Sequence, residues 1–277
     1  MREVERFLES KTPNPLDCED MIFLNSHFAG VIDGVTSKKG SKDGIPSTGK
    51  KAAELIVNAL GGIPFDASKE FVFTILNLSI REYYESRNIL KEAETSKDFR
   101  CSASVVLYSS FHREVWRVGD CPFLLDGRKM VNRKHLDSLL SELRACYLET
   151  EIRMGKTIEE LLYLDTGRAY IQELLSRQIV FQNADDPSPY NFEVIDGFFR
   201  HLDRIEVYPV PPETRSLVLA SDGYPELKPT LRESEEHLKQ IISEDPLCFR
   251  MFKSTKGVYR GNRSFDDRAY LRLSLED

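Results

Sequence analysis

The spacing of apolar residues changes several times along the first hundred positions. Two short, nearly continuous apolar runs at residues 22–24 and 28–32 are typical of strands that are covered on both faces. Beyond them, apolar residues recur at helical spacing up to residue 60, after a cap at Ser47 or Thr48. A second helical pattern covers about 68–90. The pattern therefore predicts two strands followed by two helices.

From residue 102 the period returns to that of strands. The stretch SASVVLYSSFHREVWRVGDCPFLLDGRKM holds three short apolar runs separated by turn residues, which predicts an antiparallel meander. Residues 134–178 then show the spacing of two amphipathic helices, which we interpret as packing on a sheet; a partner-binding groove is the alternative. Strands are predicted at 192–195, 204–208, 217–220 and 269–273, with a helix at 231–242. Because strands and helices do not alternate, we expect one α+β layered domain over residues 1–277.

Composition narrows the classes of function. The chain of 277 residues is 41% hydrophobic, which is enough for a sizeable core. Its net charge is −7 with no long basic block, which argues against nucleic acid as a partner. No apolar stretch reaches the roughly 20 residues that span a bilayer, and the first residues are polar, so we expect a cytoplasmic protein. The five cysteines and five histidines are dispersed, so a metal would need oxygen ligands.

The dipeptide Asp-Gly occurs five times, and each copy taken alone is most simply a turn. Two copies, however, directly follow apolar runs: Asp33-Gly34 after FAGVI, and Asp222-Gly223 after LVLAS. Two predicted strands therefore end on a carboxylate.

Further acidic residues lie beside predicted strands and turns. They are Glu19, Asp20, Asp120, Glu226, Asp266 and Asp267. One interpretation is that each is a surface turn residue. The other is a shared site, because Mg²⁺ and Mn²⁺ prefer oxygen ligands and a pair of ions needs carboxylates from several elements. Such a pair can activate a water molecule and bind a phosphoryl group.

Five segments, in order, resemble the motifs of the metal-dependent PP2C-type (PPM) protein phosphatases. CEDMIF resembles the acidic opening motif, FAGVIDGVTS the strand that ends in Asp-Gly, and VWRVGDCPFLL the Val-Gly-Asp-Ser turn. LVLASDGYPEL resembles the late Ser-Asp-Gly motif, and SFDDRAYLRL the closing Asp-Asn strand, with Asp267 where asparagine is usual. The resemblance spans residues 18–273.

The resemblance implies a four-layer αββα sandwich, two antiparallel sheets flanked by helix pairs, with two Mn²⁺ or Mg²⁺ ions at one end. It implies that Asp33 bridges both ions and that the Gly34 carbonyl is a further ligand. Asp222 and Asp266 would hold the first ion, and Glu19 or Asp20 would reach the second. The resemblance adds Asp120 and Glu226 as a third, weaker site. Asp33, Asp222 and Asp266 are accordingly the expected catalytic residues.

Two positions depart from the better-known eukaryotic members of this family. Val35 follows the glycine with no histidine in the next loop, and Pro15 stands where an arginine binds phosphate. Some bacterial relatives lack both residues too, which favours a bacterial source. A hydrated metal could replace the histidine, and Lys38 or Lys50 could meet the phosphate.

Two hypotheses follow from these motifs. The first is a phosphatase that hydrolyses phosphoserine or phosphothreonine, in a protein or a small phosphoester, by metal-activated water. The second is a PP2C-like module that binds a partner without turnover. Retention of Asp33, Asp222 and Asp266 favours the enzyme.

Overall fold

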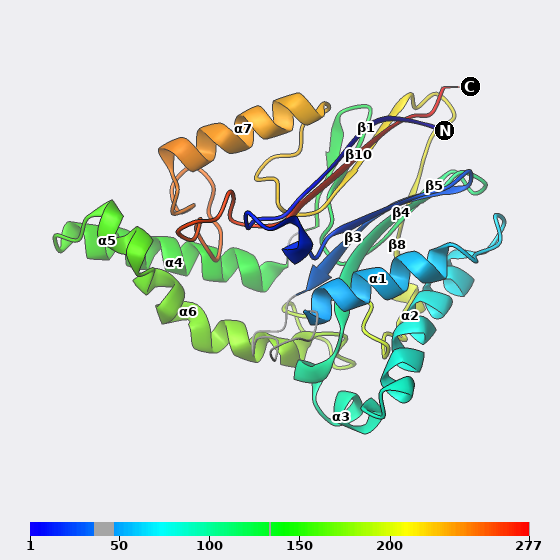
Figure 1. Ribbon diagram of the computed structural model, residues 1–277, viewed down its shortest axis with the longest axis horizontal. Helices are drawn as coiled ribbons and strands as arrows, with labels where there is room; N and C mark the ends of the chain where they lie inside the picture. The colour runs from blue at the N-terminus through cyan, green and yellow to red at the C-terminus, as the bar shows by residue number, and fades with distance from the viewer. Residues whose placement is uncertain (36–46, 133, 277) are drawn as a thin grey trace.

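Two antiparallel sheets form the centre of the computed structural model, which describes residues 1–35, 47–132 and 134–276 (Figure 1). Within these ranges each sheet has five strands. The first has the order β1-β10-β9-β6-β7, and the second has the order β2-β3-β4-β5-β8. The strands are β1 (Arg2–Glu9), β2 (Met21–Leu24), β3 (Phe28–Val35), β4 (Ser102–Ser109), β5 (Glu114–Val118), β6 (Phe123–Leu125), β7 (Arg128–Met130), β8 (Glu206–Pro209), β9 (Ser216–Ala220) and β10 (Arg268–Ser274).

Helices cover the outer faces of both sheets. The pair α1 (Thr48–Leu60) and α2 (Lys69–Ser86) packs on the second sheet, and α7 (Leu231–Glu244) lies over the first (Figure 1). The first five residues of β3 are apolar because both faces of this strand are covered. Its Phe28 and Ile32 face α1 and α2, whereas Ala29 and Val31 join the core between the two sheets. The expected αββα sandwich is therefore confirmed.

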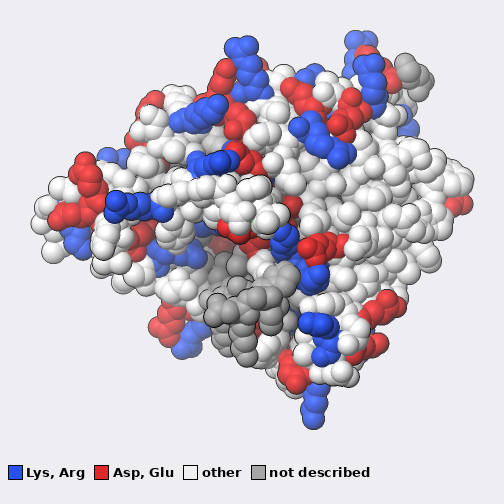
Figure 2. Space-filling view, viewed as in Figure 1, with Lys and Arg blue, Asp and Glu red and all other residues white. Residues whose placement is uncertain are grey.

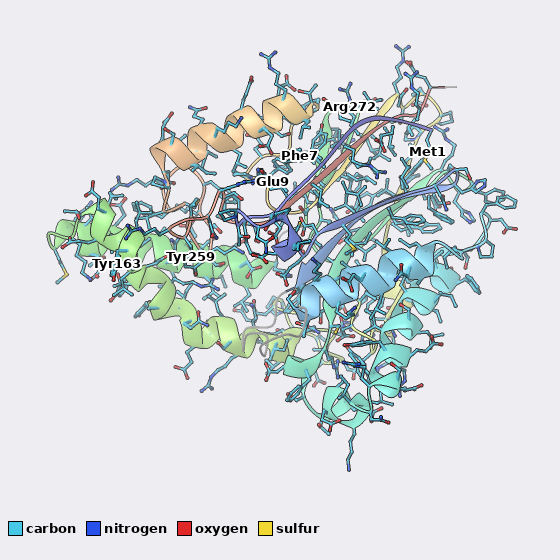
Figure 3. The ribbon with its side chains drawn as sticks, in the orientation of Figure 1. Met1, Phe7, Glu9, Tyr163, Tyr259 and Arg272 are labelled. Carbon is cyan, nitrogen blue, oxygen red and sulfur yellow. The ribbon has the colours of Figure 1, made fainter. Side chains whose placement is uncertain are left out.

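The outer face of the first sheet combines apolar and charged contacts. Figure 3 labels Phe7 and Glu9 on β1 and Arg272 on β10. Phe7 packs against the cluster under α7, while Arg272 Nη1 donates a hydrogen bond to Glu5 Oε2 at 3.2 Å. These pairs join β1 to β10, the strands nearest the two chain ends. No helix of the described residues is long and apolar enough to cross a membrane.

Three strand predictions need correction. Asp33 and Gly34 do not follow β3 but lie within it, opposite Ser104 and Ala103 of β4. The predicted meander is wrong, because after β5 the chain crosses to the other sheet, where β6 pairs with β9. Residues 192–195 form isolated bridges instead of a strand. The strand β1 was not predicted. Its sequence REVERFLE is mostly charged, because β1 lies at the exposed edge of its sheet and buries few side chains.

The helical stretch at 134–178 is divided differently from the prediction. It forms α4 (His135–Arg153), α5 (Ile158–Tyr163) and α6 (Thr166–Arg177). Gly155, with φ 106°, follows α4, and the side chains of Thr157 and Asp165 cap the starts of α5 and α6. The long helix predicted to residue 90 stops at α2, and a short α3 (Leu90–Thr95) follows Asn88 with φ 55°. In Figure 1, α4 and α6 lie beyond the end of the sheets. They form one wall of the cavity described next.

Candidate metal centre

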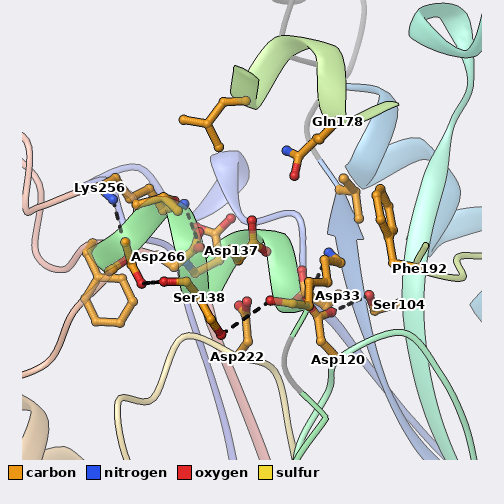
Figure 4. A pocket seen from close by; sticks show the side chains of 18 of the residues that line it. Asp33, Ser104, Asp120, Asp137, Ser138, Gln178, Phe192, Asp222, Lys256 and Asp266 are labelled. Atoms are coloured by element: carbon orange, nitrogen blue, oxygen red, sulfur yellow. Dashed lines mark hydrogen bonds and ion pairs between the residues drawn. The ribbon is translucent and has the colours of Figure 1, made fainter. Parts of the chain in front are cut away.

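A cavity of about 260 Å³ opens between one end of the two sheets and the helices α4 and α6 (Figure 4). Its lining includes carboxylates from five separate segments near the ends of strands, namely Glu19, Asp33, Asp120, Asp222, and Asp266 with Asp267. Asp20 is buried directly behind them, and its nearest charged neighbours include Asp267, Asp266 and Asp222. The structure therefore brings seven of the eight predicted acids to one place.

Close approach of backbones explains why glycine follows Asp33. A Cβ atom on Gly34 would lie 2.5 Å from the carbonyl carbon and oxygen of Gly49, and one on Gly49 would lie 2.6 Å from Gly34. The first turn of α1 thus touches β3 backbone to backbone. This contact brings Ser47, which caps α1, into hydrogen-bonding contact with Glu19. The Asp-Gly pair here is a packing requirement and not a turn.

The second Asp-Gly pair has the same cause. A Cβ atom on Gly223 would lie 2.0 Å from the Asp267 carbonyl oxygen, so only glycine lets the segment after β9 meet the start of β10. That contact sets Asp222 beside Asp266. In contrast, Asp126-Gly127 is a genuine hairpin turn, with φ of 45° and 79°.

The surroundings of Asp20 and Asp33 favour either the protonated carboxyl group or a nearby cation. Burial, then the neighbouring carboxylates, raise the pKa of Asp33 well above its usual value, and burial raises that of Asp20 in the same way. Desolvation by the surrounding protein and the Asp120 carboxylate raise the pKa of Asp222 to about 7. The side chain of Asp222 is exposed, so contact with solvent limits this rise. Among the described residues, none of these three carboxylates forms an ion pair with Lys or Arg.

Asp120, by contrast, has its own cation. Lys134 Nζ lies 3.0 Å from Asp120 Oδ2, and Ser104 Oγ donates to Asp120 Oδ1 at 2.7 Å. Against the desolvation of the site, these contacts lower the pKa of Asp120, while the same ion pair raises that of Lys134. Lys134 also lies over the ring of Phe192, 5.0 Å from its centroid. Lys134 and Asp120 together neutralise one side of the cavity.

Asp266 is bound by two lysines. Lys256 Nζ lies 2.6 Å from Asp266 Oδ2, and Lys11 Nζ lies 3.3 Å from Asp266 Oδ1. Lys11 further contacts Asp267 Oδ2 at 3.2 Å and Glu19 Oε2 at 3.6 Å. Against desolvation, the two ammonium groups lower the pKa of Asp266. Asp267 accepts backbone hydrogen bonds from Lys11 and Glu19, which fixes the loop after β1 to the start of β10.

Other predicted residues lie elsewhere. Glu226 is 48% exposed, pairs with Lys228 and His237, and lines a separate groove between α4 and α7, so it is not brought to Asp120. Pro15 lies in a short 3-10 turn, and the ammonium of Lys50 binds the Leu16 carbonyl. Neither is among the described residues that line the cavity, whereas Val35 is. Lys38 lies outside the described residues.

The three lysines were not predicted from the sequence. Lys11 and Lys256 stand in irregular segments, and Lys134 precedes α4 in a run that we interpreted as a helix start. A possible signal was an excess of acids at apolar strand ends, because carboxylates gathered in a low-dielectric site must be neutralised. Nothing in the pattern showed which cations would do so. On the face in Figure 2, basic and acidic side chains are interspersed.

The chemistry of the donors fits a divalent cation. Asp20 Oδ2 is buried and has no hydrogen-bond partner within the part of the chain that the structure describes, and the neighbouring carboxylates of Asp33 and Asp222 have raised pKa values. Oxygen donors of this kind suit Mg²⁺ or Mn²⁺. As the side chains stand, however, no group of three or more His, Cys, Asp or Glu residues within the described ranges is arranged to hold a metal ion. The physical reason is that Asp266 and Asp120 form ion pairs with lysines, so their carboxylate oxygens point towards ammonium groups and not towards the other carboxylates.

No protein-family model matches the sequence, and no curated protein matches it. Solved structures do resemble the fold. One is a bacterial serine phosphatase, at 13% identity and a TM-score of 0.51, over 100% of this chain and 98% of the other. Another is the serine/threonine phosphatase Stp1 from Staphylococcus aureus, at 13% identity and a TM-score of 0.51, over 100% and 96%. The chain therefore has the fold of PP2C-type bacterial serine/threonine phosphatases.

Proposed function

We propose that this protein is a metal-dependent phosphatase that hydrolyses phosphoserine or phosphothreonine esters. The observation that carries the proposal is the trio Asp20, Asp33 and Asp222 at one end of the sandwich. Asp20 and Asp222 both raise the pKa of Asp33, all three pKa values are raised, and none of the three carboxylates has an ion pair among the described residues. A fold gains nothing from three adjacent carboxylates unless a cation or protons neutralise them.

In this proposal, the carboxylates of the centre bind the divalent ion. Asp20, Asp33 and Asp222 would hold Mn²⁺ or Mg²⁺, with the Gly34 carbonyl, Glu19 and Asp266 as further oxygen donors. When bound, the ion supplies an activated water and neutralises the phosphoryl oxygens. The ion pair with Lys134 keeps Asp120 ionised, so this pair would form the wall of the cavity beside Asp222 without binding the ion.

The cavity itself supports a phosphoester as substrate. Its lining includes the cationic side chains Lys97, Arg100, Lys129, Lys134 and Arg168, which would attract a dianionic ester. Apolar groups, including Val131, Leu175 and Phe192, complete the walls and would contact the residues that flank the phosphorylated side chain. No histidine is among the described lining residues, so a lysine of the lining, or a water acidified by the ion when it is bound, would have to protonate the leaving group.

The test is hydrolysis of an aryl phosphate and of a phosphothreonine peptide with Mn²⁺, with Mg²⁺ and with EDTA. We expect turnover only with a divalent ion and its loss in Asp222→Asn. The matched control is Asp126→Asn, because Asp126 belongs to another Asp-Gly pair, in the β6–β7 turn. Within the described ranges its carboxylate accepts hydrogen bonds only from the backbone at Arg215 and Ser216. Folded protein that binds Mn²⁺ without turning over either substrate would point to the binding module instead.

A further inference from the structure

The carboxylate of Asp266 has an ammonium group at each oxygen. Lys256 Nζ lies 2.6 Å from Oδ2 and Lys11 Nζ 3.3 Å from Oδ1 (Figure 4 shows the Lys256 contact). A carboxylate ligates a metal through the same lone pairs that accept hydrogen bonds from an ammonium group. A divalent ion at Asp266 and the Lys256 contact are therefore in competition.

The two lysines are not equivalent in this competition. Lys11 also contacts Asp267 and Glu19, so it keeps two carboxylate partners after leaving Asp266. Among the described residues, the only ion pair of Lys256 is the one with Asp266, and its charge also acts on Asp222. Lys256 is therefore the cation whose position depends on whether Asp266 is available.

Contacts with the helices α4 and α6 hold Lys256 at this position. Arg144 Nη1 donates to the Ser254 carbonyl at 2.9 Å, and Arg168 Nη1 donates to the Thr255 carbonyl at 2.9 Å. Arg144 is fully buried and also binds the carbonyls of Leu247 and Cys248. The backbone on the N-terminal side of Lys256 is thus fixed, which lowers the entropic cost of its ion pair.

We propose that Lys256 is an internal counter-ion of Asp266 that a divalent cation must displace, so that Lys256 sets the divalent-ion affinity of the centre. The inference rests on the proposed function only in that Asp266 is taken as a metal ligand. It concerns binding of the ion and holds whether or not the ion supports turnover. In this arrangement the protein favours the ion-free centre more than its carboxylates alone would.

The experiment is a Mn²⁺ titration in which free Mn²⁺ is followed by electron paramagnetic resonance. The variant Lys256→Met keeps the aliphatic stem and removes the charge. We expect its dissociation constant for Mn²⁺ to fall by about tenfold, the factor that corresponds to one charge-assisted hydrogen bond. Lys256→Arg keeps the cation and should stay close to wild type.

The matched control is Lys253→Met. Lys253 lies in the same segment and lines the same cavity, but its ammonium pairs with Glu142 at 2.6 Å and its side chain is 41% exposed. Its loss should leave the dissociation constant near the wild-type value. If Lys256→Met does not fold, as judged by circular dichroism, Lys256→Gln takes its place.

Unchanged or weaker Mn²⁺ binding in folded Lys256→Met or Lys256→Gln would overturn the inference, as would an equal gain in Lys253→Met. Assaying phosphatase turnover in the same samples separates this result from the proposed function. Tighter Mn²⁺ binding without turnover supports the role of Lys256 and overturns the proposed phosphatase activity. Turnover with an unchanged dissociation constant for Mn²⁺ supports the phosphatase activity and overturns the role of Lys256.

Discussion

The contact between Gly34 and Gly49 is the packing feature most sensitive to a single methyl group. In Gly34→Ala the new Cβ would lie 2.5 Å from the carbonyl of Gly49 and 2.7 Å from that of Glu19. Both neighbours are backbone atoms, so no side-chain rotation relieves the clash. Ordinary contact begins at 3.4 Å, so α1 and β3 must separate by about 0.9 Å.

The magnitude follows from this overlap. Overpacking of a tight core costs about 1 to 3 kcal/mol, and a clash against two backbone groups belongs at the upper end, about 2 to 3 kcal/mol. For a chain of 277 residues the unfolding entropy is roughly 0.6 kcal/mol per kelvin, so the melting temperature should fall by about 3 to 5 °C. A displacement of this size beside Asp33 should also reduce turnover by about 100-fold.

The assay is thermal unfolding followed by circular dichroism, together with phosphatase activity in Mn²⁺. The control is Gly62→Ala, whose Cβ would lie 3.8 Å from the nearest atom at an exposed position after α1. It should keep full activity and gain up to about 1 kcal/mol from reduced unfolded-state entropy. The double variant Gly34→Ala/Gly49→Ala should cost less than the two single variants together, because one displacement relieves both clashes. A melting temperature of Gly34→Ala equal to that of Gly62→Ala would refute the reasoning.

Two further predictions concern buried charges. Arg144→Met should lower the free energy of unfolding by about 3 to 5 kcal/mol in urea titrations, since it leaves Asp165 and three carbonyls without their buried donor. Adding Asp165→Asn should recover part of that loss, and a purely additive pair would contradict the account. In EDTA, the melting temperature should fall as pH rises above about 4, because the native state keeps a proton on Asp20 that the unfolded chain has released. Asp20→Asn should flatten this slope, and an equal slope in both proteins would be the contrary result.

Elements with a strong local pattern were predictable from the sequence. The apolar stripe and a cap at Ser47 or Thr48 placed the start of α1 within one residue, and the run before Asp222 did the same for β9. The path between the sheets was not predictable, because nothing in the three apolar runs after residue 102 shows that β6 leaves β5 for β9. Pairing between distant strands depends on packing over the whole molecule, and local spacing carries no record of it.

The candidate site divides in the same way. The acids at Asp33, Asp120, Asp222 and Asp266 carried motif signals, and the fold brings them together. Lys11 and Lys256, the partners of Asp266, belong to no motif. A lysine in an irregular segment is predicted to be a surface residue, because lysine is seldom buried. The sequence predicts that the strand ends at Asp33, whereas β3 continues past it. The reason for Gly34 is its backbone contact with Gly49, fifteen residues later, and no local pattern indicates that contact.

The place of β10 in its sheet has a consequence for the order of events during synthesis. This strand, the last of those in the described residues, lies between β1 and β9, and Asp266 and Asp267 directly precede it. Until it has emerged from the ribosome, β1 has no neighbour and Lys11 lacks two of its carboxylates. A nascent chain that ends before residue 266 thus holds Asp20, Asp33 and Asp222 without the completed centre. Under the proposed function, residues 266–274 would therefore decide when the centre can first take up an ion, because contacts of high sequence separation are the slowest to form.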